Sequence, residues 1–190
     1  MRLFLASFLN PEIAAAYESL IAEMASDVPG AIRSVPSGTL HLTIVFIGNV
    51  AEANLSTCFR VLEHVKEFEA LDYTLSPPRI LYSHRSPRLV CVDVATGSQR
   101  IAMLQRSLHE RLSDTLQMSI TRPKPPHVTL ARFSKHANRQ VGSRAAESLS
   151  RRFDATRIRP DRLTGVQLVK STLTPEGPIY ESIGESKCRA

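Results

Sequence analysis

The sequence has little cysteine and no long hydrophobic run. Cys58, Cys91 and Cys188 are far apart, odd in number and in no Cys-x-x-Cys spacing, so they predict reduced thiols rather than a disulfide framework or a zinc site. No apolar run approaches the roughly 18 residues of a transmembrane helix, and residues 1–9 are too short and too strand-like for a signal peptide. These absences favour a cytoplasmic protein with no membrane partner.

Several catalytic signatures are also missing. There is no glycine-rich phosphate loop, no motif for a nucleophilic serine or cysteine, and no cluster of Asp, Glu, His and Cys with metal-ligand spacing. We therefore expect neither a cofactor nor a metal. With 190 residues, of which 43% are hydrophobic and 22% charged, the chain is long enough to bury the core of an ordinary globular protein.

Positive charge is concentrated in the second half of the chain. Residues 1–95 carry 7 Lys and Arg against 10 Asp and Glu, whereas residues 96–190 carry 17 against 8, so the halves have net charges of −3 and +9. Most of the cations are arginines, which bind phosphate in a bidentate manner. This distribution favours a polyanionic partner, although a solvated basic surface would look the same.

Two short segments share the pattern His-x-Thr followed by an apolar residue. One begins at His41-Leu42-Thr43 and the other at His127-Val128-Thr129, and each opens a run that reads as a strand. With six histidines and the chain's threonine content, only about 0.4 matches to His-x-Thr are expected by chance. The pair of motifs therefore favours a shared role over two histidines that merely decorate a sheet.

Strand geometry gives each of these segments a polar face and an apolar face. Side chains at i and i+2 point to one side of a strand, so His41 lies beside Thr43 while Leu42, Ile44 and Phe46 are expected in the core. By the same rule His127 lies beside Thr129. We therefore interpret Phe46 as a core residue rather than a surface for a nucleobase.

The remaining periodicity predicts a mixed α+β fold. Strands are expected at residues 3–9, 41–47, 71–76, 80–83, 88–95, 126–132, 153–158, 163–173 and 179–183, and helices at 11–24, 52–68, 96–115 and 138–152. Asn10 and Pro11 are typical of a helix start. Each His-x-Thr strand is followed by a helix and a pair of strands, which is a loose internal repeat.

The repeat predicts one bilobal domain over residues 1–190. Two lobes related by a pseudo-twofold axis would each contain an antiparallel-rich sheet with helices on its outer face. Residues 41–43 and 127–129 would meet in a central cleft, one strand coming from each lobe.

Two imidazoles on opposite sides of a substrate suit general acid–base catalysis. Histidine titrates near neutral pH, so one ring can act as base and the other as acid. Threonine hydroxyls can donate to the oxygens of a phosphate, and a nearby arginine can offset its charge. The constellation is suited to opening a phosphodiester, especially a strained cyclic one, with an activated water and no metal.

Five stretches of the chain together resemble a known family. They are Leu40-His41-Leu42-Thr43 with Phe46-Ile47-Gly48, the run from Pro126 to Arg132, the run from Ser171 to Tyr180, Arg2-Leu3-Phe4, and Pro78-Arg79-Ile80-Leu81. The chain resembles the two-histidine phosphoesterase superfamily, and within it the bacterial and archaeal RNA 2′,3′-cyclic phosphodiesterases, also called the 2′-5′ RNA ligase family.

The resemblance implies an activity and a set of roles. It implies hydrolysis of RNA 2′,3′-cyclic phosphate ends to 2′-phosphomonoesters without a metal or cofactor, together with reversible 2′-5′ joining of RNA. It also implies that His41 protonates the departing 3′ oxygen and that His127 activates water. Thr43 and Thr129 would hold the phosphate, and Arg132 would match the family arginine that follows the second motif.

Three features depart from that picture. Lys124-Pro125 stands where family members usually have an aromatic residue, and Ser37-Gly38-Thr39 replaces the more typical Pro-Glu-Asn before the first motif. Arg132 follows His127 by five positions, so regular alternation would turn it away from the cleft unless the strand bulges or ends. Its role therefore depends on a β-bulge or the end of the strand.

Two other functions remain open. The fold could serve as a nucleotide- or RNA-binding module, or it could hydrolyse a small cyclic nucleotide or a nucleotide-sugar cyclic phosphate. The completeness of both motifs favours catalysis, and the basic half favours RNA. We expect a monomer, with Arg122, Lys124 and Lys170 as candidate contacts to the RNA backbone.

Overall fold

A computed structural model describes residues 1–175 and 177–190 and contains both helices and strands. The α-helices are α1 (Pro11–Asp27), α2 (Leu55–Leu62), α3 (Ser98–Leu116) and α4 (Arg139–Arg152). The strands are β1 (Arg2–Phe8), β2 (Ile32–Ser34), β3 (His41–Asn49), β4 (Leu71–Leu75), β5 (Arg79–Ser83), β6 (Ser86–Thr96), β7 (His127–Phe133), β8 (Asp161–Leu163), β9 (Gly165–Thr174) and β10 (Gly177–Lys187).

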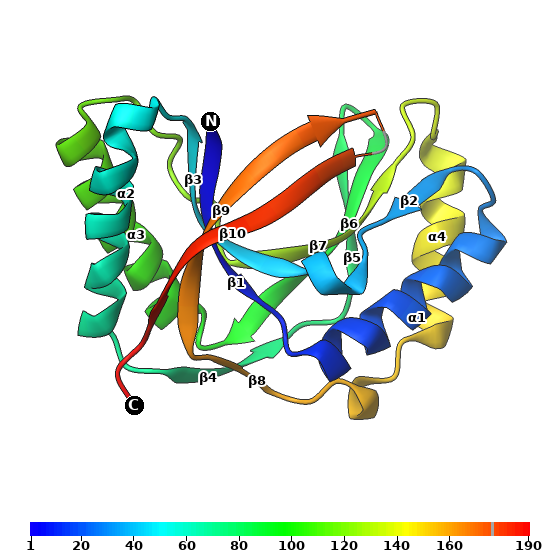
Figure 1. Ribbon diagram of the computed structural model, residues 1–190. Coiled ribbons are helices and arrows are strands. Elements are labelled where there is room, and N and C mark those ends of the chain that lie inside the picture. The colour runs from blue at the N-terminus through cyan, green and yellow to red at the C-terminus, as the bar shows by residue number, and fades with distance from the viewer. Residues whose placement is uncertain (176) are drawn as a thin grey trace.

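These strands form one curled antiparallel sheet, with the two His-x-Thr strands at its centre (Figure 1). The order is β10-β9-β1-β3-β7-β6-β4-β8, with β5 beside β6 and β2 beside β7. β3 and β7 run antiparallel, and Leu42 pairs with Val128. The predicted α+β class with antiparallel pairing is confirmed.

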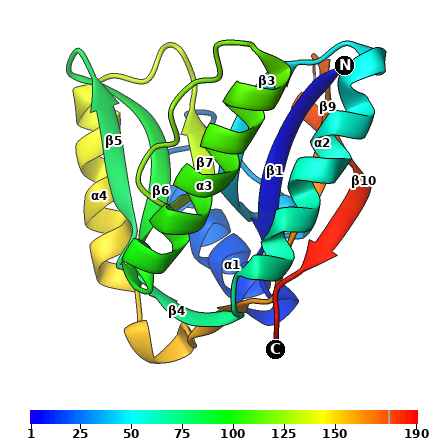
Figure 2. The same ribbon diagram turned by 90° about the vertical axis from the view of Figure 1, so that its left-hand side faces the viewer.

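The helices form two pairs at opposite ends of the sheet. α1 packs against α4, and α2 packs against α3, as Figures 1 and 2 show. The strand order is symmetric about its centre, because β1 lies beside β3 and β6 lies beside β7.

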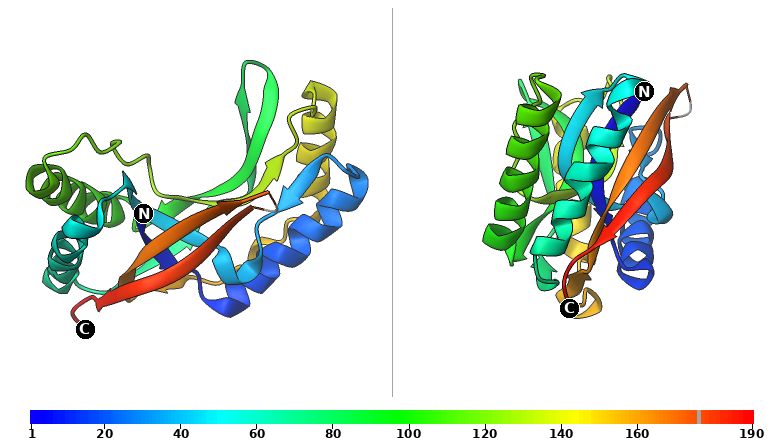
Figure 3. Two further views of the ribbon diagram at one scale, coloured as in Figure 1. Left: turned by 45° about the horizontal axis from the view of Figure 1, so that its top comes forward. Right: turned by 60° about the vertical axis from the view of Figure 1, so that its left-hand side comes forward.

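The main core lies between the helices and one face of the sheet. Leu42, Ile44, Val128 and Leu130 are at most 1% exposed there. The opposite face carries a smaller apolar cluster that includes Phe4, Val169 and Tyr180. The last two residues belong to β9 and β10, which form the hairpin seen in Figure 3. β1 is therefore buried on both faces, and its alternate residues belong to different clusters.

The predicted start of α1 is confirmed. The Asn10 side chain accepts a hydrogen bond from the backbone N–H of Glu12 at 2.9 Å, and Pro11 is the first helical residue. This places the end of β1, and with it Phe8, beside His41 at the start of β3.

Some predicted elements were wrong in extent or type. Residues 52–68 form α2 flanked by two 3-10 helices rather than one helix. Residues 153–158 contain the 3-10 helix Ala155–Arg157 instead of a strand, since the Asp154 side chain caps that turn at the N–H of Thr156. β2 lies within the region expected to be a loop.

No helix in the described part of the chain is both long and apolar enough to cross a lipid bilayer.

Candidate active site

The two His-x-Thr motifs form one site at the centre of the sheet. The pairing of Leu42 with Val128 places His41 opposite Thr129 and Thr43 opposite His127. Side chains directly opposite in an antiparallel pair have Cβ atoms about 5 Å apart. All four side chains line a cleft of about 940 Å³ on the concave face of the sheet.

Both imidazoles are held in the same way. Nδ1 of His41 lies 2.7 Å from the carbonyl oxygen of Thr39, and Nδ1 of His127 lies 2.9 Å from that of Pro125. A carbonyl can only accept, so each ring carries its proton on Nδ1 when neutral. Nε2 is thereby left as an acceptor in the neutral ring and as a donor in the protonated ring, which is the property an acid–base catalyst needs.

The two threonine hydroxyls are available to a ligand. Neither Thr43 nor Thr129 uses its hydroxyl in a hydrogen bond with the described part of the chain, although both line the cleft. Beneath Thr43, the buried Gln105 of α3 donates from Nε2 to the Thr43 carbonyl oxygen at 2.9 Å. Gln105 thus fixes the backbone that carries this hydroxyl. Its only sign in the sequence is a polar residue within an apolar stripe.

β3 and β7 each contain a β-bulge that changes the alternation of their side chains. In β3 the partners of Leu5 and Ala6 are Val45 and Thr43, so Ile44 is an extra residue. In β7 the partners of Val90 and Cys91 are Ala131 and Thr129, so Leu130 is extra. A bulge of this kind shifts the residues that follow it to the other face of the strand.

The shift brings the fifth residue after each histidine into the cleft. Arg132 is exposed and lines the cleft, which resolves the parity problem that the sequence posed. Phe46 is 37% exposed and also lines the cleft, so its interpretation as a core residue was wrong. The Cζ atom of Arg2 lies 4.9 Å from the centre of the Phe46 ring, which is a cation–π distance.

His41 lies among aromatic rings. Its ring centre is 5.2 Å from that of Phe4, 5.6 Å from that of Phe8 and 5.6 Å from that of Tyr180. Burial lowers the pKa of His41 below 6.5, and the positive charges of Arg132 and His127 lower it further, against the opposing effect of the Thr39 carbonyl. The ligand-free protein therefore favours the neutral form of His41 at neutral pH.

His127 has a carboxylate where His41 has an aromatic ring. Asp93 of β6 is its partner in the β6–β7 register, whereas Phe8 of β1 is the partner of His41. Arg79 binds Asp93 through Nε at 2.5 Å and Nη2 at 3.0 Å. This bonding is the main cause of the lowered pKa of Asp93, to which the charge of His127 also contributes, so Asp93 is an anion beside His127.

Other predicted contacts do not lie in the cleft. Arg122 and Lys124 line a separate depression of about 620 Å³ between α3 and residues 122–126. Lys170 forms an ion pair with Glu181 at 3.0 Å. Within residues 1–175 and 177–190 there is no group of three or more His, Cys, Asp or Glu side chains that could hold a metal ion.

Comparison with known proteins identifies relatives along nearly the whole chain. A family model described as the 2′-5′ RNA ligase superfamily matches residues 7–171. The RNA 2′,3′-cyclic phosphodiesterase of Archaeoglobus fulgidus is 28% identical over 187 residues, covering 96% of this chain and 98% of the relative. The protein of the same name from Aquifex aeolicus is 24% identical, with coverage of 97% and 96%.

Solved structures share the fold. TT0787 of Thermus thermophilus superposes with a TM-score of 0.72 at 24% identity, covering 98% of this chain and 97% of that one. LigT of Escherichia coli, in its complex with 3′-AMP, superposes with a TM-score of 0.70 at 22% identity and the same coverage. At this level of identity the likeness establishes the architecture.

Proposed function

Because the chain belongs to the 2′-5′ RNA ligase superfamily, we propose that it hydrolyses RNA 2′,3′-cyclic phosphate ends to 2′-phosphomonoesters by two-histidine acid–base catalysis. The observation that carries the proposal is the placement of both His-x-Thr pairs opposite each other in one cleft. The names of the full-length relatives support the choice of substrate.

The cyclic phosphate would bind between the two strands. Thr43 and Thr129 would each donate a hydroxyl to a non-bridging oxygen, and Arg132 would offset the negative charge that grows on those oxygens in the transition state. Nε2 of His127 would take a proton from water as the water oxygen bonds to phosphorus. The bond from phosphorus to O3′ would break, and Nε2 of His41 would give its proton to O3′.

The surroundings of the two rings support this division of roles. A base ends the step as a cation, and the Asp93 carboxylate beside His127 stabilises that cation. An acid ends the step neutral, and the burial of His41 favours the neutral ring. Since the ligand-free protein disfavours protonated His41, its proton would be held in the complex by the negative phosphate.

The same geometry accounts for RNA joining. If the 5′ hydroxyl of a second RNA takes the place of water, His127 would remove its proton and the new bond would link that oxygen to the 2′-bound phosphorus. The product would contain a 2′-5′ linkage, and the reverse step would regenerate the cyclic phosphate. The reaction needs no ATP because the strained ring supplies the activated phosphate.

The experiment is to incubate the purified protein with an oligoribonucleotide ending in a 2′,3′-cyclic phosphate, with and without EDTA. The expected product is the 2′-phosphomonoester, identified by ³¹P NMR against both isomers, at equal rates under the two conditions. A 3′-phosphomonoester would contradict the assigned leaving group, and loss of activity in EDTA would contradict the metal-free mechanism.

Two alternatives give different results. A binding module would retain the oligonucleotide without changing it. An esterase for small cyclic nucleotides would hydrolyse 2′,3′-cyclic AMP but not the oligonucleotide. We further propose that the enzyme acts in the cytoplasm as a monomer, which size-exclusion chromatography with light scattering would test.

A further inference from the structure

A second depression adjoins the two-histidine site, between α3 and the segment 122–126 that leads into β7. Its volume is about 620 Å³, and Figure 2 shows the segment alongside α3. Gln105 and Pro125, which line it, bond the Thr43 carbonyl oxygen and the His127 ring respectively. No described residue lines both the depression and the cleft. A group bound in the depression is therefore not the reacting phosphate.

The charged side chains around this depression are mainly cationic. Arg106, Arg122 and Lys124 line it and are exposed, against one carboxylate among the described residues, that of Glu110. None of the three cations forms a hydrogen bond or an ion pair within the described part of the chain. Their positive charge is thus available to a bound anion, and arginine and lysine both bind phosphate.

Prolines fix the conformation of the segment that carries two of these cations. Arg122 precedes Pro123, and Lys124 precedes Pro125. A residue before proline is restricted to extended conformations, so the two Cα atoms are about 6–7 Å apart. This separation is similar to that of successive phosphates along a single strand of RNA, so the two side chains can contact neighbouring phosphates.

The segment is also anchored at both ends. Nε2 of His109 on α3 donates to the carbonyl oxygen of Ile120 at 3.0 Å, and the backbone N–H of Val94 donates to the carbonyl oxygen of Pro126 at 3.1 Å. The loop between α3 and β7 is thereby held against both of its neighbours. Binding a ligand there requires little further ordering of the backbone, which favours affinity.

The depression lies in the direction in which a strand of RNA can leave the cleft past Phe46. β3 and β7 are antiparallel, so the residues before His127 lead away from the site in the same direction as the residues after Thr43. Phe46 lines the cleft on this side, and Lys124 lines the depression. A strand whose end reacts between the histidines can therefore pass Phe46 and continue to Lys124.

We propose that Arg106, Arg122 and Lys124 form a second binding site for RNA, which takes backbone phosphates on the 5′ side of the reacting nucleotide. A 2′,3′-cyclic phosphate ends an RNA chain, so the chain continues only in the 5′ direction. A longer strand can fill both sites, whereas a cyclic mononucleotide cannot. This inference rests on the proposed function and specifies that the protein prefers longer RNA.

The experiment measures, by fluorescence anisotropy, the affinity for a dinucleotide and for a dodecanucleotide of RNA that both end in a 2′-phosphate. The preference is the ratio of the two dissociation constants. Lys124→Gln should reduce the preference for the longer strand about fivefold, because one charged contact to a phosphate is lost.

The salt dependence counts the contacts. For the dodecanucleotide, the slope of log K against log salt should be smaller in magnitude by about 2 in the triple variant Arg106→Gln, Arg122→Gln, Lys124→Gln, since each phosphate contact to a single strand contributes about 0.7. An unchanged slope would overturn the second site.

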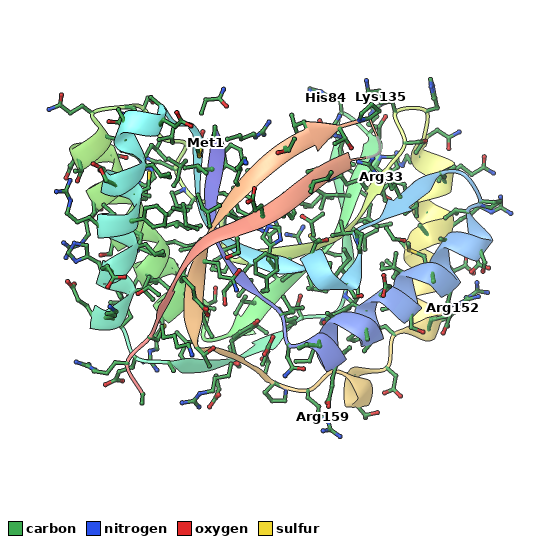
Figure 4. The ribbon with its side chains drawn as sticks, viewed as in Figure 1. Met1, Arg33, His84, Lys135, Arg152 and Arg159 are labelled. Atoms are coloured by element: carbon green, nitrogen blue, oxygen red, sulfur yellow. The ribbon has the colours of Figure 1, made fainter. Side chains whose placement is uncertain are left out.

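The matched control is Lys135→Gln. Lys135 is also an exposed lysine beside β7, but it follows the strand, whereas Lys124 precedes it. Figure 4 shows Lys135 at the opposite end of the molecule from α3. Its substitution should leave the preference within about twofold of the wild type, because a distant charge is screened by salt. Equal effects of Lys124→Gln and Lys135→Gln would overturn the site.

Glu110 provides a test of opposite sign. Glu110→Gln should raise the preference for the longer strand about twofold, because its carboxylate repels a phosphate bound in the same depression. A fall in the preference would contradict binding of an anion there.

These binding measurements require no turnover, so they separate failure of the second site from failure of the proposed function. A wild type that shows the expected preference but hydrolyses neither a cyclic-phosphate-ended dodecanucleotide nor 2′,3′-cyclic AMP would contradict the proposed function alone. Equal affinity of the wild type for the two RNAs, with hydrolysis of the cyclic phosphate, would overturn the second site alone.

Discussion

β3 and β7 are nearly equivalent in their own residues and differ in their neighbours. Each begins with His-x-Thr, bonds Nδ1 to the carbonyl two residues earlier, and bulges after the threonine. Outside this pair, β1 places Phe8 beside His41, whereas β6 places Asp93 beside His127. The repeat thus provides two similar imidazoles, and the flanking strands give them different surroundings.

The residues five positions after the two histidines also differ in chemical character between β3 and β7. Equivalent bulges bring Phe46 and Arg132 into the cleft, one aromatic and one cationic. A substrate with a base on one side and phosphates on the other would fit this asymmetry.

Removing either imidazole tests whether both strands are needed. His41→Ala and His127→Ala should each lower kcat for a 2′,3′-cyclic nucleotide by about 10³ or more, with circular dichroism unchanged, because each ring moves a proton in the same step. His136→Ala, at an exposed turn away from the cleft, is the control. Full activity in either cleft variant would refute the mechanism.

A substrate whose leaving group needs no proton tests which histidine is the acid and which is the base. In an analogue with sulfur in place of the bridging 3′ oxygen, the thiolate leaves without a proton. The analogue should recover about 10² of the activity lost in His41→Ala and little of that lost in His127→Ala. The opposite pattern would exchange the two roles.

Removing the charge of Arg132 tests the electrostatics on the β7 side. Arg132→Gln should lower kcat/KM about 10²-fold, because a donor to the developing phosphate charge is lost. The same substitution should raise the pKa of His41, since the guanidinium disfavours the imidazolium. NMR titration of the ring would measure this change, and Arg132→Lys should keep the pKa low. A pKa that does not move in Arg132→Gln would show that the Arg132 charge does not contribute to the lowered pKa of His41.

Removing the carboxylate beside His127 tests the difference between β6 and β1. Asp93→Asn should lower kcat about tenfold, because the imidazolium formed on His127 loses a neighbouring anion. Arg79→Gln, which removes the partner of Asp93 but keeps the carboxylate, should have a smaller effect. If the two variants behave alike, the ion pair matters only for structure.

The smallest effect is expected at Phe46. Phe46→Ala should raise KM for an oligoribonucleotide about fivefold with little change in kcat, because one stacking surface for a base is lost. Phe46→Tyr should retain the wild-type KM, since it keeps the ring. An equal rise in KM for both variants would show that the ring itself does not stack on the substrate.

Local patterns in the sequence predicted the elements that build the site. The start of α1 followed from Asn10 and Pro11, and the strands at residues 41 and 127 followed from apolar runs headed by His-x-Thr. Alternation correctly placed each histidine beside its threonine, because only two steps along the strand are involved. Over five steps the same rule failed for Phe46, since one extra residue in the strand reverses the face.

The sequence by itself determined which residues could carry acid–base chemistry and that they come in two equivalent sets. Only the tertiary structure decided that the sets are opposed across one cleft, that both strands bulge, and that Phe8, Asp93 and Arg33 adjoin them. The physical reason is that bulges and cross-strand neighbours depend on the register between strands distant in the sequence. That register is set by the packing of the whole sheet against its helices rather than by local residue order.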